Sequence, residues 1–241
     1  MAPLRLTTRI ALRSLRVLEG TLIKDIRSLA QWARTFDTRP CSAPDFGALN
    51  FSLMLVCLVG CETLGFYTSG ARQHSRDRSP GLCDPGVYLM DFLRDFFPAR
   101  SYFKKLGKVL ADELRHDLVH GFGSKRHGSQ VRLALYVDPD TASQIKVGTQ
   151  RGHRLLALNA VAFAEQTAEA FERLRRAVAD ESDPELVKRI ARAARLTWPP
   201  PQGVRKQFVQ VYRSALGRGL TFSVVRRARP PSATGSWRGE R

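Results

Sequence analysis

The sequence predicts a mainly helical protein, a helical bundle with a small antiparallel β meander and additional C-terminal helices. Three observations favour this fold class. Apolar residues recur at helical spacing in several segments between residues 21 and 120. Apolar and other residues then alternate over residues 131–137, which is typical of a strand, and helical spacing returns after residue 159. A chain of 241 residues that is 43% hydrophobic and 25% charged can bury a sizeable core.

We expect four parts along the chain. Residues 1–20 are predicted to be a basic N-terminal arm or extension, with an organelle transit peptide as the alternative. Four arginines precede the first acidic residue of this segment: Arg5, Arg9, Arg13 and Arg16. Residues 21–124 should form the bundle, and residues 125–225 the meander with helices packed on the bundle. Residues 226–241 are rich in Arg, Pro, Ser and Gly and are predicted to be a disordered basic tail.

The bundle is predicted to contain four helices, at residues 21–37, 46–67, 85–97 and 101–120. Asp45 and the pair Asp84 and Pro85 are typical helix starts. The second helix is apolar on nearly all sides, which favours a central position. Its most apolar stretch, residues 49–60, is shorter than the roughly 20 residues needed to cross a bilayer. We therefore expect no membrane span.

The later elements begin with three short strands, predicted at residues 131–137, 145–147 and 154–158. Asp138, Pro139 and Asp140 have turn chemistry between the first two strands. Asn159 is a candidate N-cap for a helix that runs to about residue 179 and covers the meander. Asp183 and Pro184 begin a further helix to about residue 196, and a last helix is predicted near residues 204–215.

The charge of the chain favours a phosphate-bearing partner. The formal net charge is +17, from 31 Arg and 8 Lys against 22 acidic residues. Nucleic acid, nucleotides and anionic membrane surfaces all attract such a protein. Arginine holds phosphates with two parallel hydrogen bonds and stacks on bases, so its excess over lysine favours RNA. Codon bias in a GC-rich genome explains the same excess equally well.

The four cysteines are typical of a reducing compartment, and we expect a cytoplasmic protein. Their spacing does not resemble the disulfide framework of a secreted protein. A zinc site built from Cys57, Cys61, His74 and Cys83 matches no common metal motif. We expect no metal site, with buried cysteines acting as small apolar groups.

Reactive side chains gather at the end of the fourth helix. Its apolar face is formed by leucines at four-residue spacing: Leu106, Leu110, Leu114 and Leu118. Arg115, His116 and His120 follow in the last turns. In a 2′-hydroxyl attack on the adjacent phosphorus, Arg115 would hold the phosphate and His120 would act as base or acid. His116 would be a second proton carrier or a substrate contact, and the reaction needs no metal or cofactor.

A structural role explains the same residues. Cationic side chains at a helix C-terminus interact favourably with the helix dipole, so Arg115 and His120 would then stabilise a helix end without doing chemistry. With 31 Arg and 5 His in the chain, pairs at this spacing also arise by chance. The position of the pair at the end of an amphipathic helix strengthens the catalytic interpretation, and the stabilising role at the helix end stays open beside it.

The segment ELRHDLVHGF resembles the helix-ending signature of the HEPN superfamily, in which Arg and a polar residue precede a His. The matching residues are Arg115, His116 and His120. The resemblance covers about residues 21–124 and implies a bundle of four or five helices, commonly a homodimer in which two motifs share one cleft. It also implies metal-independent RNA cleavage, often in toxin–antitoxin or defence systems, and hence an antitoxin protein as a partner. An additional acid of the family would correspond to Glu62 or Asp91.

Further cations could extend a phosphate-binding track beside the motif. They are Lys104, Lys108, Lys125, Arg126 and His127. The alternative is that they form a solvated helix face. Trp32 is expected in the core or as an interface anchor. The sequence thus predicts a metal-independent endoribonuclease, with a non-catalytic RNA-binding, nucleotide-binding or protein-interaction module as the alternative.

Overall fold

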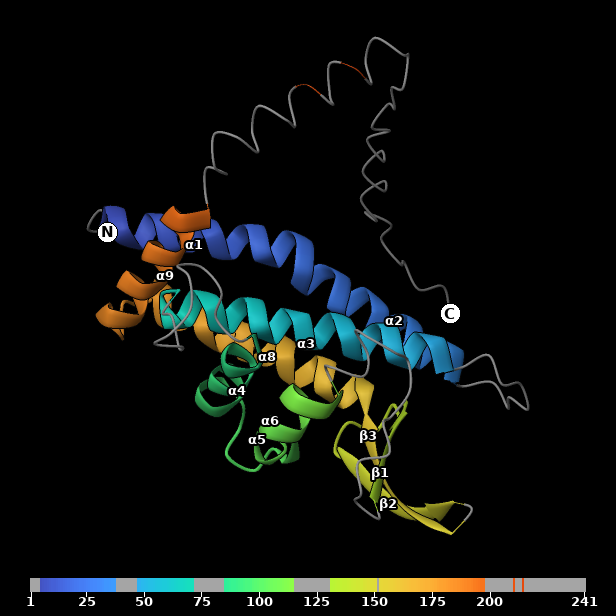
Figure 1. Cartoon of the computed structure of the whole chain (residues 1–241). Coiled ribbons are helices and arrows are strands. Elements are labelled where there is room, and N and C mark those ends of the chain that lie inside the picture. The colour runs from blue at the N-terminus through green and yellow to red at the C-terminus, as the bar shows by residue number, and fades with distance from the viewer. Residues whose placement is uncertain are drawn as a thin grey trace, which may run out of the picture. The chain divides into compact units, whose positions relative to one another are not determined.

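The computed structural model describes residues 5–37, 47–71, 85–114, 131–150 and 152–197, together with Gln210 and Ser214. The chain divides into two compact units, residues 1–198 and 199–241, and nearly all described residues belong to the first. About 75% of the described residues are helical, and the remainder include a small mixed sheet of three strands. The prediction of a mainly helical protein with a small sheet is therefore confirmed (Figure 1).

The first helical stretch runs without interruption through α1 (Leu6–Leu18), the π-helical η1 (Glu19–Ile23) and α2 (Lys24–Asp37). Its inner side is formed by Thr8, Ala11, Leu15, Leu18, Ile23, Ile26, Ala30 and Ala33. Successive members lie three or four residues apart, except for the five residues from Leu18 to Ile23. A π turn contains more residues than an α turn. The π turn of η1 therefore lets the same face of the helix point to the core before and after the five-residue step.

The structure of the N-terminus differs from the predicted basic arm. Residues from Leu6 onward form α1, which packs against α9 (Pro184–Thr197) and α8 (Ala160–Ala179). Ala11 and Leu15 are fully buried in these contacts. The sequence concealed this packing because small and hydroxyl-bearing side chains make up part of the inner side, and the arginines dominate the pattern.

Helix α3 (Gly47–Ser69) is central, as its apolar composition predicts, and contacts α2, α4 (Pro85–Phe96), α8 and α9. By length and composition, residues Asn50–Ser69 could span a membrane. The apolar stretch therefore extends beyond the predicted residues 49–60. However, 56% of this window is buried inside the protein. The central helix of a protein core is apolar on all sides for the same reason as a membrane span. The contacts of α3 with four other helices therefore explain its apolar surface.

Two glycines have distinct roles in α3: one allows a close helix crossing, and the other directly follows the last residue of the helix. An added Cβ at Gly65 would lie within 3.0 Å of the backbone carbonyl of Tyr88, so α3 and α4 cross at this point with no room for a side chain. Gly70 ends the helix with a positive φ of 70° and donates a hydrogen bond to the Tyr67 carbonyl. A left-handed residue at this position is typical of a helix C-terminus.

The three strands form a mixed sheet, so the predicted antiparallel meander is wrong. Strands β1 (Val131–Tyr136), β2 (Ile145–Gln150) and β3 (His153–Asn159) have the order β1-β3-β2. Strand β1 pairs in parallel with β3, and β2 pairs antiparallel with β3. The connection after β1 therefore passes beyond the end of β3 and does not form a hairpin with β2.

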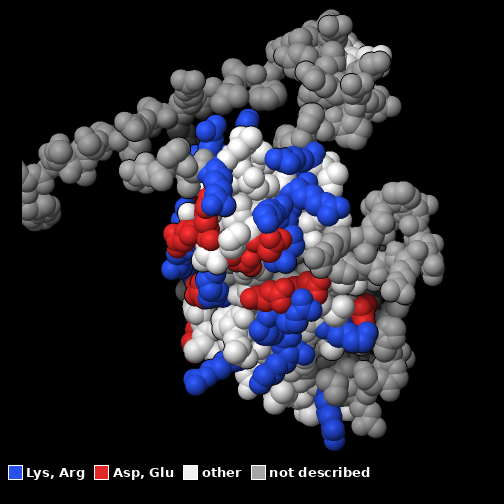
Figure 2. Space-filling view, turned by 90° about the vertical axis from the view of Figure 1, so that its left-hand side faces the viewer, with Lys and Arg blue, Asp and Glu red and all other residues white. Residues whose placement is uncertain are grey.

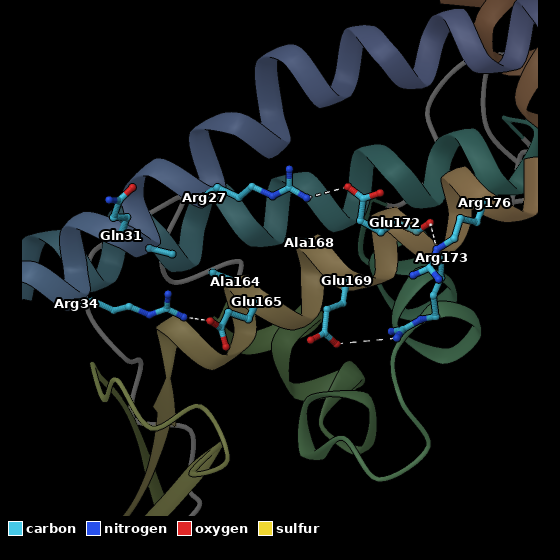
Figure 3. Close-up of a pocket in the computed structure, with 11 residues that line it drawn as sticks. Arg27, Gln31, Arg34, Ala164, Glu165, Ala168, Glu169, Glu172, Arg173 and Arg176 are labelled. Atoms are coloured by element: carbon cyan, nitrogen blue, oxygen red, sulfur yellow. Dashed lines mark hydrogen bonds and ion pairs between the residues drawn. The ribbon is translucent and has the colours of Figure 1, made fainter. Parts of the chain in front are cut away.

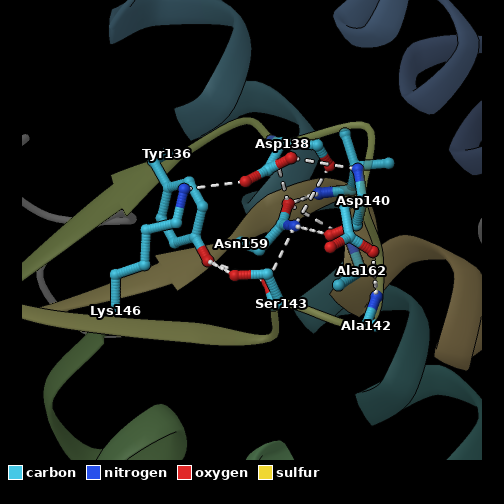
Figure 4. Close-up of polar contacts among 9 residues, drawn as sticks. Tyr136, Asp138, Asp140, Ala142, Ser143, Lys146, Asn159 and Ala162 are labelled. Atoms are coloured by element: carbon cyan, nitrogen blue, oxygen red, sulfur yellow. Dashed lines mark hydrogen bonds and ion pairs between the residues drawn. The ribbon is translucent and has the colours of Figure 1, made fainter.

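Asn159 explains this arrangement, because it holds the crossing connection and also caps the next helix (Figure 4). Its amide nitrogen donates to three carbonyls of the connection, those of Asp138, Asp140 and Ser143. Its amide oxygen accepts hydrogen bonds from the backbone nitrogens of Asp138, Val161 and Ala162. The fully buried Asn159 thus satisfies polar groups that the sheet leaves unpaired. Its predicted role as N-cap of α8 is confirmed.

Candidate functional site

The predicted catalytic residues Arg115, His116 and His120 lie outside the described residues. So do Lys125, Arg126 and His127 of the predicted phosphate track. Of the predicted substrate contacts, the structure describes two. Lys104 is half-buried, and Lys108 is exposed and paired with Asp112, which raises the pKa of Lys108 through their hydrogen bond. Both lie on the segment that leads to Arg115.

This leading segment is anchored in the core at three points. Phe103 is fully buried and meets Phe163 of α8 edge to face, with ring centroids 4.9 Å apart. Leu110 is also fully buried, and Leu114 is 7% exposed. The inward orientation predicted for these two leucines is confirmed. Arg115 therefore follows directly on a residue that is fixed in the core.

The segment is less regular than the single helix predicted for residues 101–120. It consists of α5 (Tyr102–Lys105), α6 (Gly107–Val109) and the π-helical η3 (Leu110–Leu114). Leu106 has φ −91° and ψ 8°, which interrupts the helix, and a glycine follows it. Glycine is the weakest helix former after proline, so this position favours a break. A Cβ at Gly107 would meet Leu93 at 3.7 Å, so the break lies against α4.

The two candidate acids lie on packed helices. Asp91, on α4, is half-buried and forms an ion pair with Arg94 at 2.8 Å. Glu62, on α3, is also half-buried. Arg115 lies outside the described residues, so the structure does not place the two acids relative to it. Asp91 already has a cationic partner on its own helix.

An open groove of about 830 Å³ lies between α2 and α8 (Figure 3). Its polar lining comes from Arg27, Gln31, Arg34, Glu165, Glu169, Glu172, Arg173 and Arg176. Arg27 binds Glu172 at 2.8 Å across the groove, and Arg34 is paired with Glu165. Arg173 lies 3.9 Å from Glu169 on the same helix. Three of the four arginines are therefore matched by carboxylates.

Glu172 is the centre of this ion-pair network. It accepts from Arg27 and also from Arg175, whose guanidinium lies 2.9 Å away. The hydrogen bond from Arg27 contributes most, and together these bonds lower the pKa of Glu172. Neutralised cations have little attraction left for a phosphate. The groove therefore clamps α2 to α8 and is a poor site for an anionic ligand.

Sequence reasoning missed this groove because its two walls are about 140 residues apart in the chain. A signal was present in the spacing. Arg27, Gln31 and Arg34 share one side of a helix, and so do Glu165, Glu169 and Glu172. Only the packing of α2 on α8 showed that these two sides face each other.

The described cysteines are structural thiols. Cys57 and Cys61 are fully buried on α3, and burial raises the pKa of Cys61 to about 12. The Cys61 sulfur lies 3.6 Å from the Thr167 hydroxyl. His74 and Cys83 lie outside the described residues, and in the described part of the chain no three His, Cys, Asp or Glu side chains gather as a metal site would require.

No protein family, curated protein or solved structure matches this chain.

Proposed function

We propose that this protein is a HEPN-like, metal-independent endoribonuclease whose catalytic residues are Arg115, His116 and His120. The observation that supports the proposal is the anchoring of the segment before them. Because Phe103, Leu110 and Leu114 are buried, the chain enters the motif from a fixed point. Catalytic groups need such support, since small displacements of a reacting group cost large factors in rate.

The proposed reaction is the attack of a ribose 2′-hydroxyl on the adjacent phosphorus. His120 removes the hydroxyl proton, or donates a proton to the leaving 5′-oxygen, and His116 serves as the other proton carrier. Arg115 neutralises the charge that develops on the non-bridging oxygens. The oxygen–phosphorus bond to the 5′-oxygen breaks, which leaves a 2′,3′-cyclic phosphate and a free 5′-hydroxyl. Lys104, Lys125, Arg126 and His127 contact the flanking phosphates. Lys108 does so by exchanging its exposed partner Asp112 for a phosphate.

The assembly that we propose follows the same resemblance. The helices between residues 21 and 124 act as a HEPN-type bundle, and two copies pair so that both motifs line one cleft. Trp32 on α2 is 61% exposed, which is unusual for a tryptophan and typical of an interface anchor. An antitoxin protein would cover the cleft, and the site of action would be the cytoplasm.

The test is cleavage of a mixed-sequence, 5′-labelled RNA by the purified full chain in excess EDTA. We expect products that end in a 2′,3′-cyclic phosphate and a pH profile governed by groups near the ordinary histidine pKa of about 6.5. His120→Ala should lower the rate by about 10²–10⁴-fold. Arg115→Lys should also be harmful, because an ammonium cannot form the planar two-pronged contact.

The matched control for Arg115→Lys is Arg100→Lys. Arg100 is exposed and forms no ion pair with another described residue, so this variant should cleave at the wild-type rate. All variants must retain the wild-type helical circular dichroism, since a capping role predicts lost stability with unchanged chemistry. If His120→Ala cleaves as fast as the wild type, the proposed catalysis is wrong.

A further inference from the structure

A row of cations follows the outer side of α1. It consists of Arg5, Arg9, Arg13 and Arg16, and all four side chains are exposed. Successive members lie three or four residues apart, so they share one side of the helix, opposite the buried Ala11 and Leu15. Helical rise places Arg5 and Arg16 about 16 Å apart. We call these four residues the arginine row.

The arginine row has no carboxylate partners among the residues that the structure describes. None of its four guanidinium groups forms an ion pair with another residue that the structure describes. Glu181, which lies next to α1, accepts a hydrogen bond from Thr8 on the inner side. By contrast, Arg27 and Arg34 on α2 are matched by glutamates of α8. Uncompensated positive charge is therefore retained on α1.

Helix α9 also carries exposed cations, near the beginning of α1. Arg192 and Arg195 are exposed and, like the row, form no ion pair within the described ranges. They line a shallow hollow together with Thr7, which lies four residues before the buried Ala11 and shares its side of α1. Arg192 and Arg195 therefore lie beside the helix and do not continue the arginine row. Figure 2 shows the side of the protein on which α1 begins and α9 lies; many Lys and Arg side chains are exposed there, with Asp and Glu side chains among them.

We propose that the arginine row is a surface that binds the phosphate backbone of single-stranded RNA. Guanidinium groups at regular spacing on a rigid helix can each contact a phosphate without a cost in ordering the backbone. The choice of RNA over DNA rests on the proposed function, whereas the binding of phosphates rests on the charges alone. Lys104 and Lys108 lie on another element, so this surface would hold RNA outside the cleavage site.

The structure disfavours an anionic membrane as the partner. A helix that lies in a membrane surface buries its apolar side among the lipids. The apolar side of α1 is already buried against α8 and α9, where Ala11 and Leu15 are inaccessible. Leu6 and Val17 are exposed, but they are single side chains near the two ends of the helix.

The test uses a probe that cannot be cleaved. A fluorescein-labelled 2′-O-methyl uridine 20-mer lacks the attacking hydroxyl, so its fluorescence anisotropy reports binding whether or not the protein is a ribonuclease. Each phosphate contact with a single strand contributes about −0.7 to the slope of log K against log salt. Four contacts predict an affinity loss of about 50-fold between 50 and 200 mM salt, and two contacts predict about 7-fold.

Arg9→Gln/Arg13→Gln removes two of the four contacts, and its matched control is Arg100→Gln/Arg154→Gln. The control lowers the net charge equally at two exposed cations on other elements. We expect the row variant to bind about 10- to 25-fold more weakly at 100 mM salt with a slope smaller by about 1.4, and the control to bind within 2-fold of the wild type. Gly20→Arg should strengthen binding, because Gly20 is next along the row and an added Cβ there meets nothing within 4 Å.

Equal weakening in the row variant and the control would overturn the proposal, because net charge alone would then explain binding. Binding to phosphatidylglycerol vesicles that the row variant abolishes, with no binding of the oligonucleotide, would identify an anionic membrane as the partner instead. His120→Ala should bind the probe as the wild type does. A protein that binds the probe through the row but cleaves no RNA would therefore refute the proposed catalysis and leave this surface intact.

Discussion

Replacing Gly65 with alanine tests the crossing of α3 and α4, which supports the segment leading to Arg115. A Cβ at this position would lie within 3.0 Å of the Tyr88 carbonyl oxygen, a distance that real Cβ atoms essentially never show. The obstacle is backbone, so no side-chain rotation can relieve the contact and the two helices must move apart. Because Gly107 lies against α4, that movement also reaches the segment before the motif.

The sign of the effect follows from comparing three glycines of the helices. Alanine is favoured over glycine within a helix by about 1 kcal/mol. At Gly20 nothing lies within 4 Å, so Gly20→Ala should stabilise the protein by about 0.5–1 kcal/mol. At Gly60 the nearest atom is the flexible end of Ile26, at 3.1 Å, and the two effects should nearly cancel. At Gly65 overpacking costs about 3 kcal/mol or more, which leaves a net loss of about 2 kcal/mol.

Thermal unfolding followed by circular dichroism at 222 nm measures this ranking. For a protein of this size, each kcal/mol shifts the midpoint by about 2–4 °C. We expect Gly65→Ala to melt about 4–8 °C below the wild type, Gly60→Ala close to it, and Gly20→Ala about 1–4 °C above it. If Gly65→Ala melts at or above the wild-type temperature while Gly20→Ala is stabilised, α3 and α4 do not cross at this glycine.

Further predictions concern stability and reactivity. Leu114→Ala should lower the free energy of unfolding by about 2–5 kcal/mol, measured in urea, and a loss below 1 kcal/mol would contradict its burial. Asn159→Ala should cost about 2–4 kcal/mol, because both the α8 cap and the crossing connection lose partners; Asn159→Asp, which keeps the cap, should cost less. The pKa of Glu172 is lowered in the folded protein, so its contribution is present above the unfolded-state pKa and is lost as pH falls below about 4.5. Glu172→Gln should accordingly cost up to about 1 kcal/mol at pH 7 and less at pH 3, and an equal cost at both values would argue against the ion pairs. Cys57 and Cys61 should resist iodoacetamide at pH 8 until the protein unfolds, as mass spectrometry would show, because burial raises the pKa of both thiols.

Much of the helical structure could be predicted from local sequence. Asn159 predicts a helix start because its residue type favours the N-cap position, and its side chain caps the backbone nitrogens two and three residues later. Asp183, which caps the Leu186 nitrogen, marked the start of α9 in the same way. The spacing of the leucines at positions 110 and 114 predicts that both lie in the core, as they do. Each of these inferences depends on residues within about one helical turn.

The candidate site was less accessible to such reasoning. The motif of Arg115, His116 and His120 is a pattern of residue types, and its chemistry depends on where those side chains converge. The arginine row was visible as a spacing of four, four and three residues. The spacing alone is compatible with a mobile basic arm. Because α1 packs against α8 and α9, its cations form a fixed surface.

The sequence by itself determined the helices α2, α3 and α4, the residues at which α8 and α9 begin, and the excess of positive over negative charge. Only the tertiary structure decided that β1 runs parallel to β3 and that α2 faces α8 through ion pairs. It also decided that the arginine row has no carboxylate partner within the described part of the chain. Helix formation and capping depend on neighbours three or four positions away, which the sequence displays. Strand order and charge compensation depend on residues brought together from distant parts of the chain, and many pairings satisfy the same local pattern.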